Sequence, residues 1–263
     1  MAPFVRCVWT LTGPAASERA PQPVVPDGCM ELILNFGDPF DRHRLDGSFV
    51  ERQPLDLIVG PSTGPAVIVP TGAVDLIGVR LQPWGAAALL GIEPAALRDA
   101  LLPMRDVNGA VASSMASVRD GHDVSDRLQR LRSALEPLAT RAKAPDPALR
   151  AVIALLDTTQ PTSSVRDVAA RVGRSVRWVQ RGFEREVGLS PKMVGRIART
   201  QRALRIADRF PSWSWGAVAA AAGYFDQSHL VRDFRQIVGY APAELALRAG
   251  ELTDVFREGT PQD

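Results

Sequence analysis

The last hundred residues of this chain contain one pattern twice. Each copy has a short apolar stretch that ends in glycine, Gly173 or Gly223, and then a second stretch that closes with Gly-x-x-Pro. Glycine adopts the left-handed conformation that a tight turn between two helices needs. Each copy therefore predicts a helix-turn-helix unit. The residues that recur 51 positions apart are Arg181 and Arg232, Phe183 and Phe234, Gly188 and Gly239, and Pro191 and Pro242.

The second helix of each predicted unit is amphipathic. Val179 and Phe183 in the first unit, like Leu230 and Phe234 in the second, fall on the side that faces the core. The opposite side carries groups that can contact base edges, since Arg reads guanine, Gln reads adenine and an apolar group can meet the methyl of thymine. The predicted base-reading residues are Arg177, Gln180, Arg181, Gln227, Ser228, Val231 and Arg232.

Positive charge is concentrated in the same part of the chain. The net charge is only +2, but residues 145–249 carry 16 basic and 9 acidic groups. Binding to nucleic acid depends on phosphate neutralisation, so this asymmetry favours DNA. A basic face that is merely solvated is the alternative. The predicted phosphate contacts are Arg174, Ser175, Arg196, Arg199, Arg202, Arg205, His229 and Arg235.

The N-terminal part has the pattern of a small β domain. Short stretches rich in β-branched residues, at 5–11, 30–36, 55–59, 66–69 and 74–81, are separated by Gly and Pro, which is typical of a barrel or sandwich. Helices are predicted at 86–90, 94–102, 108–119 and 123–140. Polar and aromatic side chains on the strands either line an effector cavity or are ordinary barrel packing. The candidates are Trp9, Glu31, Asn35, Arg80 and Trp84.

These motifs carry a resemblance to a known family. The run Gly223–Pro242 resembles the C-terminal signature of the AraC/XylS regulators, and Ser175–Pro191 resembles their first motif. The resemblance implies seven helices, two helix-turn-helix units and a rigid linker helix at about 191–209. Two departures are Ala241, which replaces the usual Thr or Ser cap, and Gly182, a glycine inside a helix that costs about 0.5–1 kcal/mol. The N-terminal part resembles the short cupin-like sensor domains of some members.

Several other classes find little support in the sequence. Cys7 and Cys29 have no partners at metal-ligand spacing and are expected to be free thiols, so neither a metal nor a cofactor is predicted. The motifs of hydrolases, nucleotide-binding enzymes and zinc peptidases are absent. No apolar run in the sequence has the length of a membrane span, and residence in the cytoplasm is expected.

The sequence thus predicts an α+β protein of four parts. A β-rich effector-sensing domain at 1–105 resembles a cupin-like barrel or sandwich, and a helical connector follows at 106–144. An all-α DNA-binding domain at 145–249 holds two helix-turn-helix units joined by a linker helix, and an acidic tail covers 250–263.

The predicted function is sequence-specific regulation of transcription without enzymatic activity. The expected partners are double-stranded DNA, contacted in two successive major grooves, a small-molecule effector, and RNA polymerase if the protein is an activator. A homodimer is left open. The alternative is a ligand-binding or enzymatic β-barrel protein whose helical domain mediates protein contacts.

Overall fold

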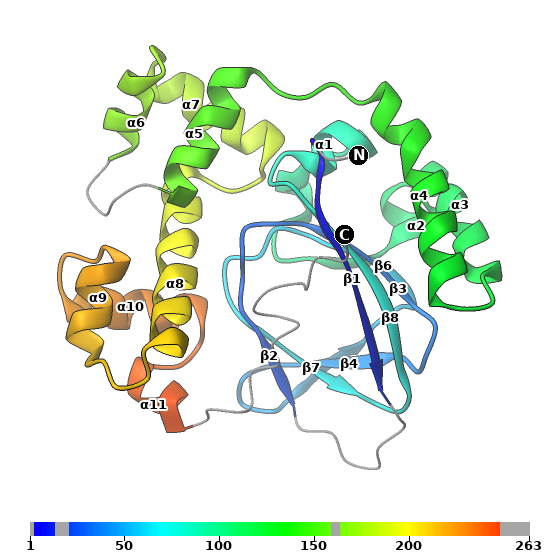
Figure 1. Ribbon diagram of the computed structural model, residues 1–263, viewed down its shortest axis with the longest axis horizontal. Coiled ribbons are helices and arrows are strands. Elements are labelled where there is room, and N and C mark those ends of the chain that lie inside the picture. The colour runs from blue at the N-terminus through cyan, green and yellow to red at the C-terminus, as the bar shows by residue number, and fades with distance from the viewer. Residues whose placement is uncertain (1–2, 14–20, 159–163, 248–263) are drawn as a thin grey trace.

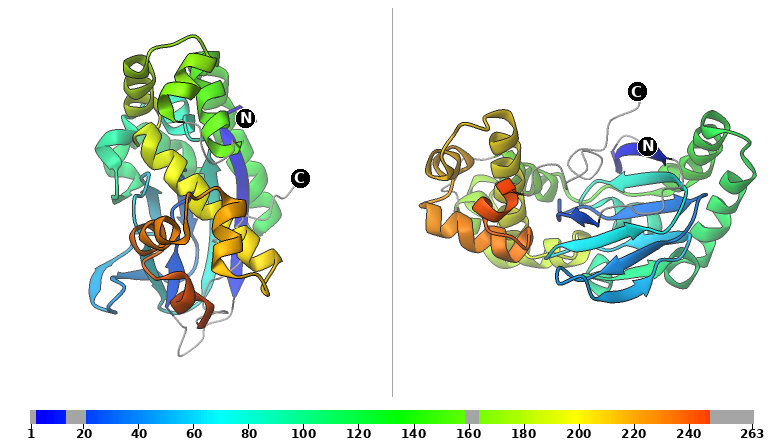
Figure 2. Two further views of the ribbon diagram at one scale, coloured as in Figure 1. Left: turned by 90° about the vertical axis from the view of Figure 1, so that its left-hand side faces the viewer. Right: turned by 90° about the horizontal axis from the view of Figure 1, so that it is seen from below.

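The computed structural model describes residues 3–13, 21–158 and 164–247. Its N-terminal part is built from antiparallel sheets and its C-terminal part is helical, which confirms the predicted α+β class. Figure 1 shows the sheets beside a separate group of helices, and Figure 2 shows the same division from two further directions. The acidic tail predicted at 250–263 lies outside the described residues.

Within the described residues, nine strands form two antiparallel sheets. Side chains from both sheets meet in one small core around Trp9, Phe40, Ile68 and Leu76, so the sheets form a sandwich. The first sheet has the order β1 (Val5–Gly13), β8 (Val74–Leu81), β3 (Glu31–Asn35), β6 (Asp56–Val59) and β9 (Leu101–Pro103). The second has the order β2 (Gln22–Val24), β7 (Ala66–Pro70), β4 (Phe40–His43) and β5 (Phe49–Arg52).

Helices cover the outer face of the first sheet. Strand β3 shows why, because alternate side chains of a strand point to opposite faces. Leu32 and Leu34 pack in the core beneath the helices, whereas Glu31 and Ile33 line the interior of the sandwich. The helical elements of this part are α1 (Gly85–Leu90), η1 (Pro94–Leu97), α2 (Met104–Val107), α3 (Gly109–Ala116), η2 (Ser117–Asp120) and α4 (Val124–Arg141).

The prediction of a helix at 94–102 is wrong. The structure has only the short 3-10 helix η1 there, and Asp99 then takes a positive φ of 58°. The next residues form β9, which pairs with β6 and is the edge strand of the first sheet. A strand forms here despite the helix propensity of the segment, because pairing with β6 satisfies backbone hydrogen-bonding groups of Leu101–Pro103. The strands β2, β4 and β5 were also missed, since they lack a run of β-branched residues.

The C-terminal part contains the seven helices that the family resemblance implied. Serine or aspartate caps begin most of them, with Ser164, Ser175, Ser190, Ser214 and Asp226 each accepting a backbone N–H. The helices are α5 (Pro147–Thr158), α6 (Val165–Arg171), α7 (Val176–Glu186), α8 (Pro191–Arg209), α9 (Trp215–Ala222), α10 (Gln227–Ile237) and α11 (Pro242–Leu247).

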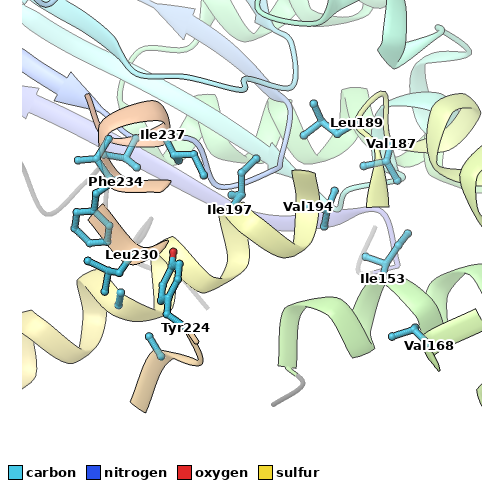
Figure 3. Close-up of a cluster of buried hydrophobic side chains, with 14 of the residues drawn as sticks. Ile153, Val168, Val187, Leu189, Val194, Ile197, Tyr224, Leu230, Phe234 and Ile237 are labelled. Atoms are coloured by element: carbon cyan, nitrogen blue, oxygen red, sulfur yellow. The ribbon is translucent and has the colours of Figure 1, made fainter. Parts of the chain in front are cut away.

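One continuous core joins these helices. Figure 3 shows Ile153 and Val168 at one end of it and Leu230 and Phe234 at the other. The glycine inside α7 has a packing role, because a Cβ on Gly182 would lie 2.8 Å from the side chain of Leu149 on α5. Gly182 therefore lets α7 approach α5. The cap lost at Ala241 is partly replaced, since Glu244 accepts the backbone N–H of Ala241 at 2.8 Å.

We predict that Gly78→Ala destabilises the sandwich. Gly78 pairs with Trp9 across β1 and β8, and a Cβ there would overlap the buried indole ring. Overpacking of this kind lowers the free energy of unfolding by about 1–3 kcal/mol. Urea unfolding of the variant measures the loss. Gly109→Ala is the matched control, because a Cβ at Gly109 meets nothing within 4 Å, and equal midpoints for the two variants would contradict the prediction.

Candidate nucleic-acid interface and effector cavity

Helix α7 presents the predicted reading face of the first unit to solvent. Gly173 takes the left-handed conformation, with φ at 66°, and Ser175 then caps α7 by accepting the N–H of Trp178. Val179 and Phe183 are buried in the helical core. The three predicted base-reading residues of this helix, Arg177, Gln180 and Arg181, are all exposed.

Helix α10 repeats this arrangement in the second unit. Gly223 takes a left-handed φ of 94°, and the Tyr224 hydroxyl lies 2.9 Å from that of Thr200 on α8. Burial raises the pKa of Tyr224 to about 12, so this hydroxyl stays protonated. The turn is thereby anchored to α8. Of the predicted base-reading residues on α10, Gln227, Ser228 and Arg232 are exposed and Val231 is half-buried.

Four of the five arginines on α8 are predicted phosphate contacts, and three of these four have protein partners in the structure. Arg196 and Arg199 lie 2.7 and 3.7 Å from the carboxylate of Asp233 on α10, which is only 3% exposed. Arg202 donates to the carbonyl oxygens of Ala222 and Asp157. The structure thus uses these three side chains to hold the second unit on α8. The fourth predicted contact, Arg205, is exposed, and contact with phosphate stays a prediction for all four.

The other predicted phosphate contacts lie near the two turns. The guanidinium of Arg174 is 5.0 Å from the ring centre of Trp178 and 3.5 Å from Asp146. His229 packs edge-on against Tyr224, while Ser175 and Arg235 are exposed. Arg174, Ser175, Arg235 and Arg205 are therefore the predicted phosphate contacts that solvent reaches most freely, and contact with DNA stays a prediction for each.

A cavity of about 110 Å³ lies inside the β sandwich. Four of the five predicted effector residues line it: Trp9, Glu31, Asn35 and Arg80. One oxygen of Glu31 accepts hydrogen bonds from the Trp9 indole and the Arg80 guanidinium, at 3.2 and 2.7 Å. Burial raises the pKa of the Glu31 carboxyl, and the nearby Arg80 acts in the opposite direction. The cavity therefore combines apolar walls with one polar cluster.

The fifth predicted effector residue, Trp84, does not line this cavity. Its indole donates to the carbonyl of Pro3, and its ring packs against both the helical core and the core beneath α4. A separate cavity of about 190 Å³ lies beside it, between the β part and helices α5 and α8. The prediction rested on the position of Trp84, three residues after the end of β8, where the chain turns away from the sandwich interior.

Among the contacts between the β part and the helical part, three are ones to which nothing in the sequence pattern pointed. Arg98 donates twice to the carbonyl of Gly188, at 2.9 and 2.7 Å, in the turn after α7. Gly239, the matching glycine after α10, abuts Leu45 and Pro65 so closely that a Cβ would overlap them. Gln201 on α8 donates to the carbonyl of Pro26 at 2.7 Å.

The described residues hold no group of three or more His, Cys, Asp or Glu side chains placed to bind a metal ion. Cys7 and Cys29 are free, as predicted, and burial raises the pKa of the Cys29 thiol. No helix among the described residues is long and apolar enough to cross a membrane.

Comparison with known proteins agrees with this geometry. Residues 168–248 match a family described as a helix-turn-helix domain, and residues 1–103 match a domain of unknown function (DUF6597). The uncharacterized HTH-type transcriptional regulator YidL of Escherichia coli K12 is 34% identical over 102 residues, which are 37% of this chain and 34% of YidL. The chain thus matches about a third of the length of that relative.

Solved structures show weaker likeness. ToxT from Vibrio cholerae is 10% identical over 94% of this chain and 100% of its own, with a TM-score of 0.49. An AraC-type regulator structure from Chromobacterium violaceum is 25% identical over 40% of this chain and 93% of its own, with a TM-score of 0.36.

The sequence matches, the two capped recognition helices and the long helix between them define one class. The C-terminal part is a helix-turn-helix domain.

We predict that Asp233→Ala loosens the second unit. The substitution leaves Arg196 and Arg199 without the carboxylate that faces them, and breaking a buried ion pair costs about 3 kcal/mol. Urea unfolding followed by tryptophan fluorescence measures the loss. Arg232→Ala is the control, since it changes an exposed neighbour on the same helix. Equal stability of the two variants would show that the Asp233 cluster does not hold α10.

Proposed function

We propose that this protein is a non-enzymatic, sequence-specific DNA-binding regulator of transcription that acts in the cytoplasm. The observation that carries the proposal is the pair of capped helices, α7 and α10, which occupy matched positions in two units and keep their polar sides exposed. Helix-turn-helix proteins insert such a helix into the major groove with its N-terminal residues on the base edges. Two units on one chain suit two successive grooves.

The helix between the units supports this mode of binding. At about 1.5 Å per residue, the 19 residues of α8 span roughly 28 Å. One turn of DNA rises roughly 34 Å, so a rigid helix of this length can hold two units at a spacing on the scale of neighbouring grooves. Arg177, Gln180, Arg181, Gln227, Ser228, Val231 and Arg232 are the proposed base-reading residues. Arg174, Ser175, Arg205 and Arg235 are the proposed phosphate contacts, which set register without reading sequence.

We also propose that a small molecule binds in the cavity of the β sandwich and controls the DNA-binding part. The walls of the cavity adjoin the three contacts described above, those of Arg98, Gly239 and Gln201. Pro26, whose carbonyl binds Gln201, is itself a lining residue, and Asp99 follows Arg98 directly. Ala66 lines the cavity beside Pro65, which abuts Gly239. A ligand that moves these walls therefore acts on both helix-turn-helix units.

We predict specific, salt-dependent binding to a DNA site selected from a random duplex pool. Fluorescence anisotropy at several salt concentrations should show a linear fall of log affinity with log salt, because phosphate contacts release counterions. Arg177→Ala and Arg232→Ala should each cost about 1–3 kcal/mol on that site and relax the preference at one base pair.

Arg132→Ala is the control for these two variants, because Arg132 is an exposed arginine on α4. If all three variants bind like the parent, the assigned reading faces are wrong. If the parent prefers no sequence at any salt concentration, the proposed function fails.

We predict that a cavity ligand found by a thermal-shift screen loses its effect in Ala66→Trp. Ala66 is a small residue on the cavity wall, so a tryptophan there fills space that the ligand needs. A ligand at a hundred times its Kd should stabilise the parent by about 2.7 kcal/mol. Ala116→Trp, on the exposed end of α3, should respond like the parent. A ligand that stabilises Ala66→Trp as strongly as the parent binds elsewhere.

A further inference from the structure

The most exposed large apolar side chain recorded in the described residues is Phe225, at 93% exposure. It stands immediately before Asp226, the residue that caps α10. Exposed apolar side chains of this size are ordinary when they occur singly. The position of Phe225 is what distinguishes it, because it lies at the end of the proposed recognition helix that enters the groove.

The structure holds Phe225 outward by anchoring the residues on both sides. On one side, Tyr224 is buried, with its N–H donated to Ala219 and its hydroxyl at Thr200. On the other side, the Asp226 side chain accepts the N–H of His229 at 2.7 Å. The backbone on either side of Phe225 is therefore fixed by its neighbours, while its own ring contributes little to the core. A rigidly presented aromatic ring loses little conformational entropy on binding.

The two units differ at this position. The first unit has one residue, Arg174, between its turn glycine and its cap, whereas the second has two, Tyr224 and Phe225. Arg174 and Phe225 recur at the 51-residue spacing. The position before the cap thus carries a cation in the first unit and an apolar ring in the second.

We propose that Phe225 is a specificity-determining residue of the second unit and that it contacts the C5-methyl group of a thymine in the half-site of α10. Thymine is the base that offers an apolar group in the major groove, and phenylalanine is among the side chains that meet it there. An arginine at the matching position makes polar contacts instead. The inference rests on the proposed DNA-binding function, and it assigns a thymine to the half-site that α10 contacts.

The test uses the full chain and the duplex that it selects from a random pool. Each thymine of the two half-sites is replaced singly by deoxyuridine, which removes only the methyl group. We expect the parent to lose about fourfold in affinity at one or two positions of one half-site, the effect of one buried methyl group. Phe225→Ala should bind the unmodified duplex about tenfold more weakly and lose the sensitivity to deoxyuridine at those positions.

Two further variants serve as controls. Phe225→Leu should retain part of the sensitivity, because it remains apolar. Phe49→Ala removes another exposed phenylalanine, 57% exposed on β5, and should bind like the parent. Unchanged melting temperatures are expected for all three, since neither ring is in a core.

The outcomes separate the inference from the function on which it rests. The inference is overturned if Phe225→Ala binds like the parent, if it stays equally sensitive to deoxyuridine, or if no thymine methyl matters to the parent. In each of those cases the protein still selects a duplex and the proposed function stands. If the parent selects no duplex, the proposed function fails and the inference falls with it.

Discussion

Both helix-turn-helix units are built on one uninterrupted helix, α8, and the rest of the C-terminal part depends on it. The first unit leads directly into α8 through Gly188 and the cap Ser190. The second unit packs against α8, where the buried carboxylate of Asp233 on α10 faces Arg196 and Arg199. A helix of this length is stiff, so it holds the two units in a fixed position relative to each other. That fixed arrangement supports the proposed contact with two successive grooves.

One position of the repeat makes a different kind of contact in each of the two units. Gly182 and Asp233 recur at the same spacing of 51 residues, yet one packs against a leucine and the other binds arginines. In the first unit, the missing side chain lets α7 approach α5 by van der Waals contact. In the second, a charged contact fastens α10 to α8. The same position of the repeat therefore holds the first unit to α5 and the second unit to α8, each by a different kind of interaction.

The β sandwich contacts both units at equivalent points. The glycines that follow α7 and α10 are Gly188 and Gly239, and each meets the β part. A side chain at either position would overlap that surface, so glycine is needed there for close approach as well as for its positive φ. Because the walls of the sandwich cavity lie next to these contacts, a change in the cavity has a short path to the recognition helices.

The sequence by itself determined the repeated units, their caps and turns, and the sides of α7 and α10 that face the core. These features follow from local chemistry, since a cap, a turn glycine and a 3.6-residue apolar period act within a few residues of one another. It also located four of the five cavity residues, because alternate side chains of a strand share a face. The tertiary structure alone decided that Arg196, Arg199 and Arg202 hold the second unit rather than face outward. It also placed Trp84 outside the sandwich, turned 101–103 into a strand and joined Arg98 to Gly188. Each of these outcomes depends on a partner far away in the chain, and a local pattern of residues does not indicate which partner that is.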